Sequence, residues 1–353
     1  MAERSSTAGR VVSISGCAVA GIVSCLPGRR ISNSPFEEQF GESAVKDVVK
    51  MIGVESRYWT DESTSTSDLC AKAARRLLHQ LDWSPDSIDA FIFVSQTPDF
   101  RLPASSCSLQ ADLALSPACI AFDINLGCSG YPYALWLGMT MVQTGAARRV
   151  LLAVGDTVSK IIDLKDRSTA LLFGDAGTVT ALEAAQGKKA TFIMGTDGRG
   201  AANLIVPRGG FKDYSLRGDV RLTDKKADCL YMDGGEIFNF TLKMIPPLVN
   251  ETILASGRTL DDHDGFLFHQ ANMFMLKHLI KKSNLPLEKV PINIDQFGNT
   301  SSASIPLLMT TSLKSRLSSD SMCLGMFGFG VGYSWAGASL DVGPLQCVET
   351  IQL

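Results

Sequence analysis

The amino-acid sequence predicts an α/β fold. Short apolar, β-branched segments alternate with longer amphipathic segments, and this alternation is typical of a mostly parallel sheet covered by helices. The chain has 353 residues, a length that favours two domains or one large duplicated fold. Hydrophobic residues make up 45% of the chain and charged residues 20%, which is the composition of an ordinary globular protein.

The predicted elements follow one another in a regular order. Residues 11–26 resemble the apolar part of a signal peptide, but three serines interrupt them, and we interpret them as a buried first strand that ends at Pro27-Gly28. The stretch 195–235 has little periodicity, which indicates a segment that covers a functional site or a mobile segment. Periodicity predicts helices at 66–81, 130–145, 236–256 and 270–283, and buried strands at 91–95, 120–127 and 150–155 and from 266 and 323 onward.

Charge and cysteine usage exclude several classes of protein. There are 33 Lys and Arg against 36 Asp and Glu, so a net charge of −3 gives no general attraction to nucleic acid. No run of 18 uncharged apolar residues exists, so we expect no membrane-spanning helix. The nine cysteines stand singly, without metal-ligand spacing. This pattern indicates a reduced, cytoplasmic protein with no metal site.

Cys128 is the first candidate for chemistry. It follows the predicted strand 120–127 and precedes a helix in which Pro132 suits the first turn. A helix N-terminus stabilises thiolate, the nucleophilic form of cysteine. Gly127 and Gly130 indicate a tight turn approached by a ligand. The alternative is a buried structural cysteine.

His269 and Asn299 are the candidate polar partners. His269 follows a buried strand, as Cys128 does, and it is the histidine best suited to acid–base work, although a structural role is the alternative. Asn299 lies in a turn of small polar residues, where it could simply cap a helix or could donate a hydrogen bond to a developing enolate oxygen. The glycines at 328, 330 and 332 do not have dinucleotide-loop spacing, and they favour backbone N–H groups arranged as an oxyanion hole.

Taken together, these motifs resemble the β-ketoacyl-[acyl-carrier-protein] synthase III family of the thiolase superfamily. The matching strings span nearly the whole chain. They are FDINLGCSGY (122–131), DRSTALLFGDAG (166–177), MDGGEIFNF (232–240), HQAN (269–272), GNTSSASIP (298–306) and GFGVGYSW (328–335).

The resemblance implies a five-layered αβαβα thiolase fold made of two similar halves, 1–185 and 186–353. It implies that Cys128 takes up an acyl group as a thioester, with the N–H groups of Cys128 and Val331 as oxyanion hole. His269 and Asn299 would bind the thioester carbonyl of malonyl-acyl carrier protein during decarboxylation. The enolate would then attack the Cys128 thioester, with no cofactor beyond acyl-CoA or acyl-carrier-protein thioesters as substrates.

The family is dimeric, and the resemblance places residues 96–104 near the twofold axis. Leu102 occupies a position where the family often has a Phe that closes the partner's acyl pocket, so a smaller side chain implies room for a longer acyl chain. Lys277, Lys281 and Lys282 offer a cationic patch for an acidic carrier protein, or else form a solvated helix face.

The nucleotide-contacting residues of the family are largely replaced. Asp47 and Met51 stand where many members have a Trp and an Arg, and Phe274 replaces a further Arg, which leaves Arg167. We therefore expect an acyl-carrier-protein donor or an unusual acyl-CoA. The family function, which starts a fatty acid, polyketide or related acyl chain, is the leading hypothesis. A non-decarboxylating acyltransferase and a non-catalytic carrier-protein-binding subunit are the alternatives.

Overall fold

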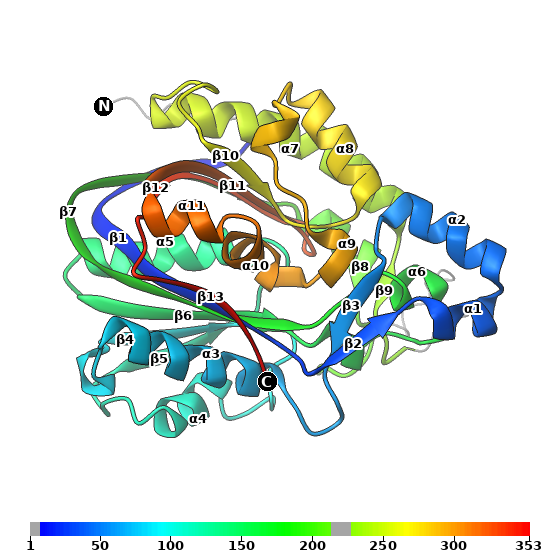
Figure 1. Cartoon of the computed structure of the whole chain (residues 1–353), viewed down its shortest axis with the longest axis horizontal. Coiled ribbons are helices and arrows are strands. Elements are labelled where there is room, and N and C mark those ends of the chain that lie inside the picture. Colours follow the sequence, from blue (N-terminus) through cyan, green and yellow to red (C-terminus); the bar gives the residue numbers. More distant parts are fainter. Residues whose placement is uncertain (1–7, 213–226) are drawn as a thin grey trace.

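The computed structural model describes residues 8–212 and 227–353, and these residues form five alternating layers of helices and strands (Figure 1). Helices α7 (Gly234–Ser256) and α8 (Met273–Lys282) cover one outer face, and α3 (Thr66–Leu81) and α4 (Ser105–Asp112) cover the other. Between the two strand layers lie three further helices, which are α5 (Gly130–Gln143), α10 (Ser304–Thr311) and α11 (Lys314–Ser319). This is the predicted αβαβα arrangement.

Two long strands connect the strand layers. Strand β7 (Ala176–Thr196) pairs through residues 190–196 with β12 (Ser334–Val342) and through residues 176–183 with β6 (Arg149–Asp156). Strand β1 (Arg10–Leu26) follows β7 along its length and shifts register twice. The remaining strands are β10 (Gly265–Phe268) and β11 (Met322–Gly330) beside β12, β4 (Ala90–Val94) and β5 (Ile120–Ile124) beyond β6, and β13 (Cys347–Gln352) beside β1.

The expectation of a mostly parallel sheet is wrong, because the sheet is mixed. Parallel pairs are β1–β13, β10–β11, β4–β5 and β4–β6, whereas β7 is antiparallel to β1, β6 and β12. Strands β11 and β12 are also antiparallel, since the three residues that separate them are too few for a parallel crossover. The periodicity of a sequence depends on burial and not on strand direction, so it could not predict which strands run antiparallel.

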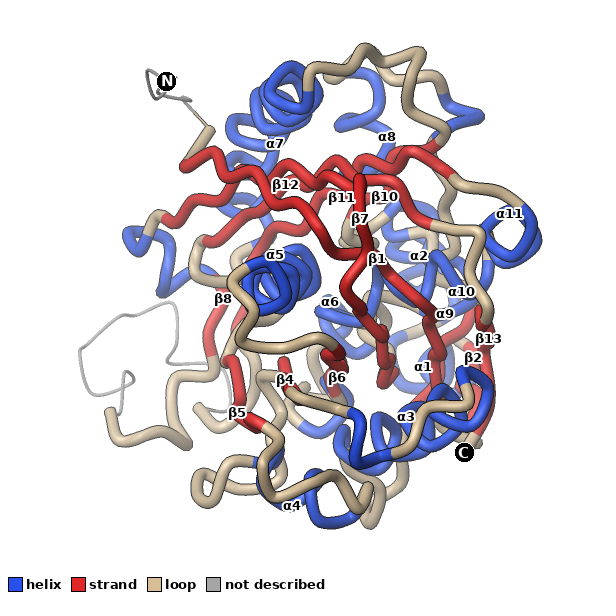
Figure 2. Tube along the Cα trace, turned by 90° about the vertical axis from the view of Figure 1, so that its left-hand side faces the viewer, coloured by secondary structure: helices blue, strands red, loops and turns tan. Residues whose placement is uncertain are grey.

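The central layer forms the main core. Helix α5 packs between β11 and β12 on one side and β4 and β6 on the other (Figure 2). Its side chains Tyr131, Leu135 and Met139 are therefore buried within one cluster that spans both strand layers. Burial on both sides explains why the helix is almost uniformly apolar and not amphipathic.

Most of the predicted elements are present. The first strand forms, and α3 has the predicted bounds. Helix α8 begins at Met273 and not at Gln270, because the Asn272 side chain caps it by accepting a bond of 2.8 Å from the Met275 N–H. Strand β5 is shorter than expected and is not buried. It ends the strand order, and Ile120 is 45% exposed there.

The expected halves, 1–185 and 186–353, remain a prediction, and residue 185 lies within β7. The aperiodic stretch 195–235 contains the short strands β8 (Leu204–Ile205) and β9 (Tyr231–Met232), and residues 213–226 lie outside the described part. The other elements are β2 (Arg29–Ser32), α1 (Ser34–Phe40), α2 (Glu42–Ile52), β3 (Ser56–Trp59), α6 (Arg167–Ala170) and α9 (Ile294–Phe297).

Within residues 8–212 and 227–353, no helix combines the length and the apolar character needed to cross a membrane.

Candidate active site

Cys128 lies between β5 and α5, and its side chain is only 7% exposed. The chain passes very close to it on β11. A Cβ atom added at Gly330, where φ is +155°, would lie 2.9 Å from the Cys128 Cβ and 3.0 Å from its Sγ. A Cβ at Gly127 would lie 2.3 Å from the Gln96 Oε1. Glycine is therefore required at 330 by both the backbone conformation and the close contact, whereas a side chain at 127 would have to displace the Gln96 side chain.

The electrostatics of Cys128 differ from the prediction. We expected the helix N-terminus to stabilise the thiolate, but burial, reinforced by the Asp156 carboxylate, raises the pKa of the thiol to about 11. Hydrogen bonds from the Ser301 side chain and from the backbone N–H groups of Val331 and Cys128 oppose this rise in pKa without cancelling it. Desolvation disfavours the charged form more strongly than these donors favour it. The resting thiol is therefore protonated at neutral pH.

The same backbone donors converge on the Cys128 sulfur. The N–H groups of Cys128 and Val331 both reach the region of the sulfur, because Val331 directly follows the last residue of β11. Gly328 allows this approach, since a Cβ there would lie 2.8 Å from the Cys128 carbonyl oxygen. Two backbone N–H groups that converge beside a thiol are an arrangement that can stabilise an oxyanion.

His269 directly follows β10 and is 2% exposed. Its backbone N–H donates to the Phe327 carbonyl over 2.9 Å, its Nδ1 lies 2.8 Å from the Ser304 Oγ, and the Phe329 ring meets it edge-on. Burial lowers the pKa of His269 to about 3. The imidazole is therefore neutral under physiological conditions, so it is suited to hydrogen bonding rather than to carrying a positive charge.

Asn299 lies between α9 and α10 and is 5% exposed. Its Oδ1 accepts a hydrogen bond of 2.9 Å from the Ser301 N–H, and its Nδ2 donates to the Ala271 carbonyl over 3.4 Å. The backbone of Asn299 is fixed too, because its N–H donates to the Leu172 carbonyl. The amide is thus oriented by its oxygen, which leaves donor capacity on its nitrogen.

Cys128, His269 and Asn299 line one cavity of about 80 Å³, together with apolar side chains that include Phe329 and Leu172. The structure therefore brings together the three residues singled out in the sequence. Hydrogen-bond donors in such an apolar space act more strongly than they would in water.

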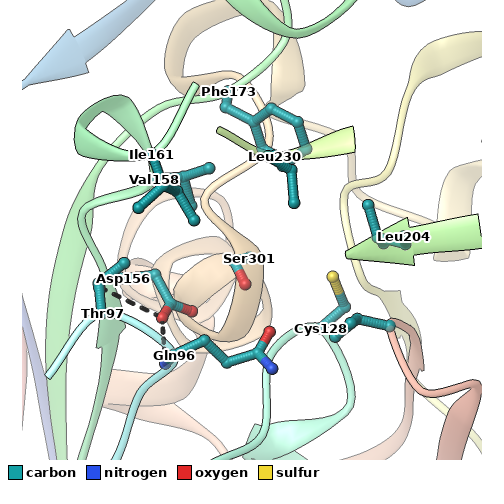
Figure 3. A pocket seen from close by; sticks show the side chains of 11 residues that line it. Gln96, Thr97, Cys128, Asp156, Val158, Ile161, Phe173, Leu204, Leu230 and Ser301 are labelled. Atoms are coloured by element: carbon teal, nitrogen blue, oxygen red, sulfur yellow. Dashed lines mark hydrogen bonds between the residues drawn. The ribbon is translucent and has the colours of Figure 1, made fainter. Parts of the chain in front are cut away.

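Cys128 also lines a second, smaller cavity of about 40 Å³ (Figure 3). Asp156 and Ser301 form part of its wall, and Figure 3 shows the Ser301 hydroxyl between the Asp156 carboxylate and the sulfur. Sequence reasoning missed both residues. Asp156 is the last residue of β6, one position beyond the strand predicted at 150–155, and its sequence context carries no further signal.

The other predicted positions lie away from the thiol. Leu102 is 79% exposed, and Lys277, Lys281 and Lys282 are exposed on α8, where Lys282 donates to the Leu242 carbonyl over 3.0 Å. Arg167 lines a separate hollow of about 430 Å³ beside Asp47 and Met51. The structure thus groups the positions that the resemblance assigned to nucleotide contacts.

The cysteines other than Cys128 do not extend the site. Six of the nine cysteines are buried, as expected for small apolar residues. In the described ranges, no three side chains of His, Cys, Asp or Glu gather as a metal site.

Comparisons with known proteins indicate one family. Residues 122–198 match the family model of 3-oxoacyl-[acyl-carrier-protein (ACP)] synthase III, and residues 253–342 match the model of its C-terminal part. A β-ketoacyl-[acyl-carrier-protein] synthase III of Caldanaerobacter subterraneus is 33% identical over 91% of this chain and 96% of its own. A putative 3-oxoacyl-[acyl-carrier-protein] synthase 3 of Campylobacter jejuni is 34% identical over 92% of this chain and 93% of its own.

Solved structures agree with this result. The crystal structure of a 3-oxoacyl-(acyl-carrier protein) synthase from Burkholderia xenovorans LB400 superimposes with a TM-score of 0.97 at 62% sequence identity, and it covers 98% of this chain and 100% of that one.

Proposed function

The chain belongs to the β-ketoacyl-[acyl-carrier-protein] synthase III family, and from this premise we propose that Cys128, His269 and Asn299 carry its reaction. The protein is a condensing enzyme of the acyltransferase class. The reaction joins an acyl thioester to malonyl-acyl carrier protein with loss of carbon dioxide, at the start of a fatty acid or related acyl chain.

In the first step, Cys128 attacks the acyl thioester. The sulfur forms the new thioester bond while the donor thiol leaves, and the N–H groups of Cys128 and Val331 bind the carbonyl oxygen as its negative charge develops. Because the carbonyl oxygen gains most charge in the tetrahedral state, these donors favour the transition state over the substrate.

In the second step, malonyl-acyl carrier protein loses carbon dioxide. The electrons of the broken C–C bond collect on the thioester oxygen as an enolate, and His269 and Asn299 donate hydrogen bonds to that oxygen. Burial keeps the His269 imidazole neutral, and it donates to the enolate oxygen in the tautomer that carries its proton on Nε2, with Nδ1 facing the Ser304 hydroxyl. The enolate carbon then attacks the acyl group on Cys128, which forms the β-ketoacyl product and frees the sulfur.

The observation that carries this proposal is the shared cavity, in which a buried nucleophile faces an imidazole and a carboxamide. The test is intact-protein mass spectrometry after incubation with a panel of acyl-CoA and acyl-carrier-protein donors, combined with release of labelled carbon dioxide from malonyl-acyl carrier protein. Cys128→Ala should take up no acyl group. Acylation without carbon dioxide release would contradict the decarboxylating reaction, and failure of every donor to acylate Cys128 would contradict catalysis altogether.

We propose that the donor is an acyl-carrier protein or an unusual acyl-CoA. The hollow that contains Arg167 presents the acidic Asp47 and the uncharged Met51, so apart from Arg167 it offers little to an adenine ring or a phosphate. Phe274, at a position where the family has an Arg, is 44% exposed and packs against Phe238 and His278. A preference for acetyl-CoA over every other donor in the panel would overturn this part.

We further propose a homodimer. Strand β5 stands at the end of the strand order, and Ile120 on it is 45% exposed. Phe100 and Leu102 add exposed apolar surface, at 62% and 79%. An open strand edge and exposed apolar side chains favour pairing with a second copy. Sedimentation equilibrium measures the oligomeric state, and a monomer at micromolar concentration would contradict the proposal.

A further inference from the structure

Asp156 is a buried carboxylate that the reaction described above does not use. It is 1% exposed, and none of the ion pairs in the described part of the chain involves it. Hydrogen-bond donors surround it instead. The Gln96 N–H and the Ser95 hydroxyl reach its Oδ1 at 2.7 and 3.1 Å, and the Ser302 hydroxyl reaches its Oδ2 at 2.7 Å.

Ser301 stands between this carboxylate and the catalytic sulfur. Its side chain acts on both groups, lowering the pKa of the Cys128 thiol and that of the Asp156 carboxyl, and all three residues line the same small cavity (Figure 3). Ser301 is 6% exposed, so its hydroxyl is largely shielded from water. A hydroxyl placed this way can accept a proton on one side while it donates its own on the other.

The backbone holds Ser301 in place at some cost. Its φ of +51° is unusual for a residue other than glycine. The Ser301 N–H is tied to Asn299 and its carbonyl accepts a bond of 2.8 Å from the Ser304 hydroxyl, which in turn contacts His269. One strained residue thus connects all three proposed catalytic side chains.

We propose that Ser301 and Asp156 form a proton relay that activates the Cys128 thiol. As the sulfur attacks the acyl carbonyl, its proton passes to the Ser301 Oγ while the Ser301 hydroxyl proton passes to the Asp156 carboxylate. The S–C bond forms, the donor thiolate leaves, and solvent protonates it. When condensation later frees the Cys128 thiolate, the proton returns from Asp156 through Ser301, so the enzyme ends as it began. This inference rests on the proposed role of Cys128.

The chemistry calls for such a base. A buried thiol whose pKa is raised to about 11 needs a proton acceptor at neutral pH. His269, the other titratable side chain of the catalytic cavity, is a weak base because burial lowers its pKa to about 3, and its Nδ1 is engaged by Ser304. Burial also raises the pKa of Asp156, which makes its carboxylate a better proton acceptor than an exposed one. In this relay Ser301 lies beside the reacting sulfur in the shared cavity, whereas Asp156 acts through Ser301.

The test uses iodoacetamide, which needs no acyl donor and so is independent of the proposed condensation. The alkylation rate of Cys128 in the full-length protein is followed by mass spectrometry of the peptide that contains it. The Asp156→Asn substitution distinguishes two roles of Asp156, because they change the alkylation rate in opposite directions. If Asp156 acts only as a nearby charge, its removal lowers the pKa of the thiol and speeds alkylation at pH 7. If it acts as the base, alkylation slows by about 100-fold.

Ser301→Ala should slow alkylation by a similar factor, and the double variant should lose no more than either single one, because a relay fails when any member is missing. Ser302→Ala is the matched control. It removes a hydroxyl from the same carboxylate outside the relay, so it should stay within about threefold of the wild-type rate. Faster alkylation in Asp156→Asn, or additive losses, would overturn the relay.

A second measurement covers the case in which Asp156→Asn does not fold. In the wild type, the relay keeps Cys128 reactive well below the pKa of the thiol. The alkylation rate should therefore level off at pH values between the pKa of Asp156 and the pKa of the Cys128 thiol. In Ser301→Ala this plateau should vanish, and the rate should rise about tenfold per pH unit toward the pKa of the thiol. A plateau that persists in Ser301→Ala would overturn the proposal.

Discussion

The backbone N–H of Ser301 donates a hydrogen bond to the Asn299 Oδ1 over 2.9 Å. This bond identifies the oxygen of the Asn299 amide and therefore its orientation, which leaves the Nδ2 group as the donor that a substrate oxygen can use. The strained Ser301 backbone thus sets the orientation of the Asn299 amide.

Replacing Asn299 with Ala removes this donor. We expect carbon dioxide release from malonyl-acyl carrier protein to fall by about 100- to 1,000-fold, while Cys128 still takes up an acyl group to completion in intact-mass measurements. Asn293→Ala is the control, because Asn293 is equally buried and donates to the Thr311 hydroxyl over 2.9 Å. Equal losses in the two variants would show that Asn299 has a structural role only.

Gly330 should tolerate no side chain. A Cβ there would lie 3.0 Å from the Cys128 Sγ at a φ of +155°, so Gly330→Ala should displace the thiol and abolish measurable acylation. Gly145→Ala carries the same kind of backbone strain at φ +78° with nothing within 4 Å of the added atom. It should lose about 1 kcal/mol of stability and acylate normally. An active Gly330→Ala enzyme would contradict the close packing around the thiol.

His269 should make the protein less stable in acid. Its pKa is about 3 in the folded state against 6.5 as the ordinary value, so the unfolded chain binds the proton more readily. The free energy of unfolding therefore falls as the pH drops below 6.5, by about 2 kcal/mol at pH 5 from this group. Denaturant titrations of wild type and His269→Gln at several pH values measure this fall in the free energy of unfolding. Parallel pH profiles for the two proteins would contradict the shift.

Leu102 should control the length of the acyl chain if the homodimer forms. It is 79% exposed in the single chain, so a role in the acyl pocket requires the partner subunit. Leu102→Phe should shift the preferred donor toward shorter acyl chains, as measured over a series of donor lengths. Leu287→Phe, at a site 65% exposed on a different surface, serves as the control. Coinciding profiles for wild type and Leu102→Phe would count against the prediction.

The lysines of α8 should affect binding of the carrier protein more than the chemistry. Lys277→Glu combined with Lys281→Glu reverses two exposed charges, and we expect the KM for malonyl-acyl carrier protein to rise about tenfold at low salt with little change in kcat. Lys189→Glu on β7 is the control, since Lys189 is exposed elsewhere. An unchanged KM in the double variant would leave these lysines as a solvated helix face.

Local patterns in the sequence were enough to find most of the elements and two of the candidate site residues. Helix α3 matches its predicted bounds because its amphipathic spacing and capping residues lie within a few positions of one another. Cys128 and His269 could be found because each follows an apolar strand and precedes a helix. The five-layered fold and the roles of the residues came from the resemblance to a family and not from periodicity.

Long-range packing settled what those patterns could not. The mixed direction of the sheet, the exposure of β5 and the placement of Asp156 depend on residues far apart in the chain. The charge state of Cys128 shows why. A helix N-terminus can be inferred from neighbouring residues, but desolvation depends on every atom that surrounds the sulfur, and here burial outweighs the local donors. A chemical group is specified by its position in the sequence, whereas its pKa and its partners follow from the folded surroundings.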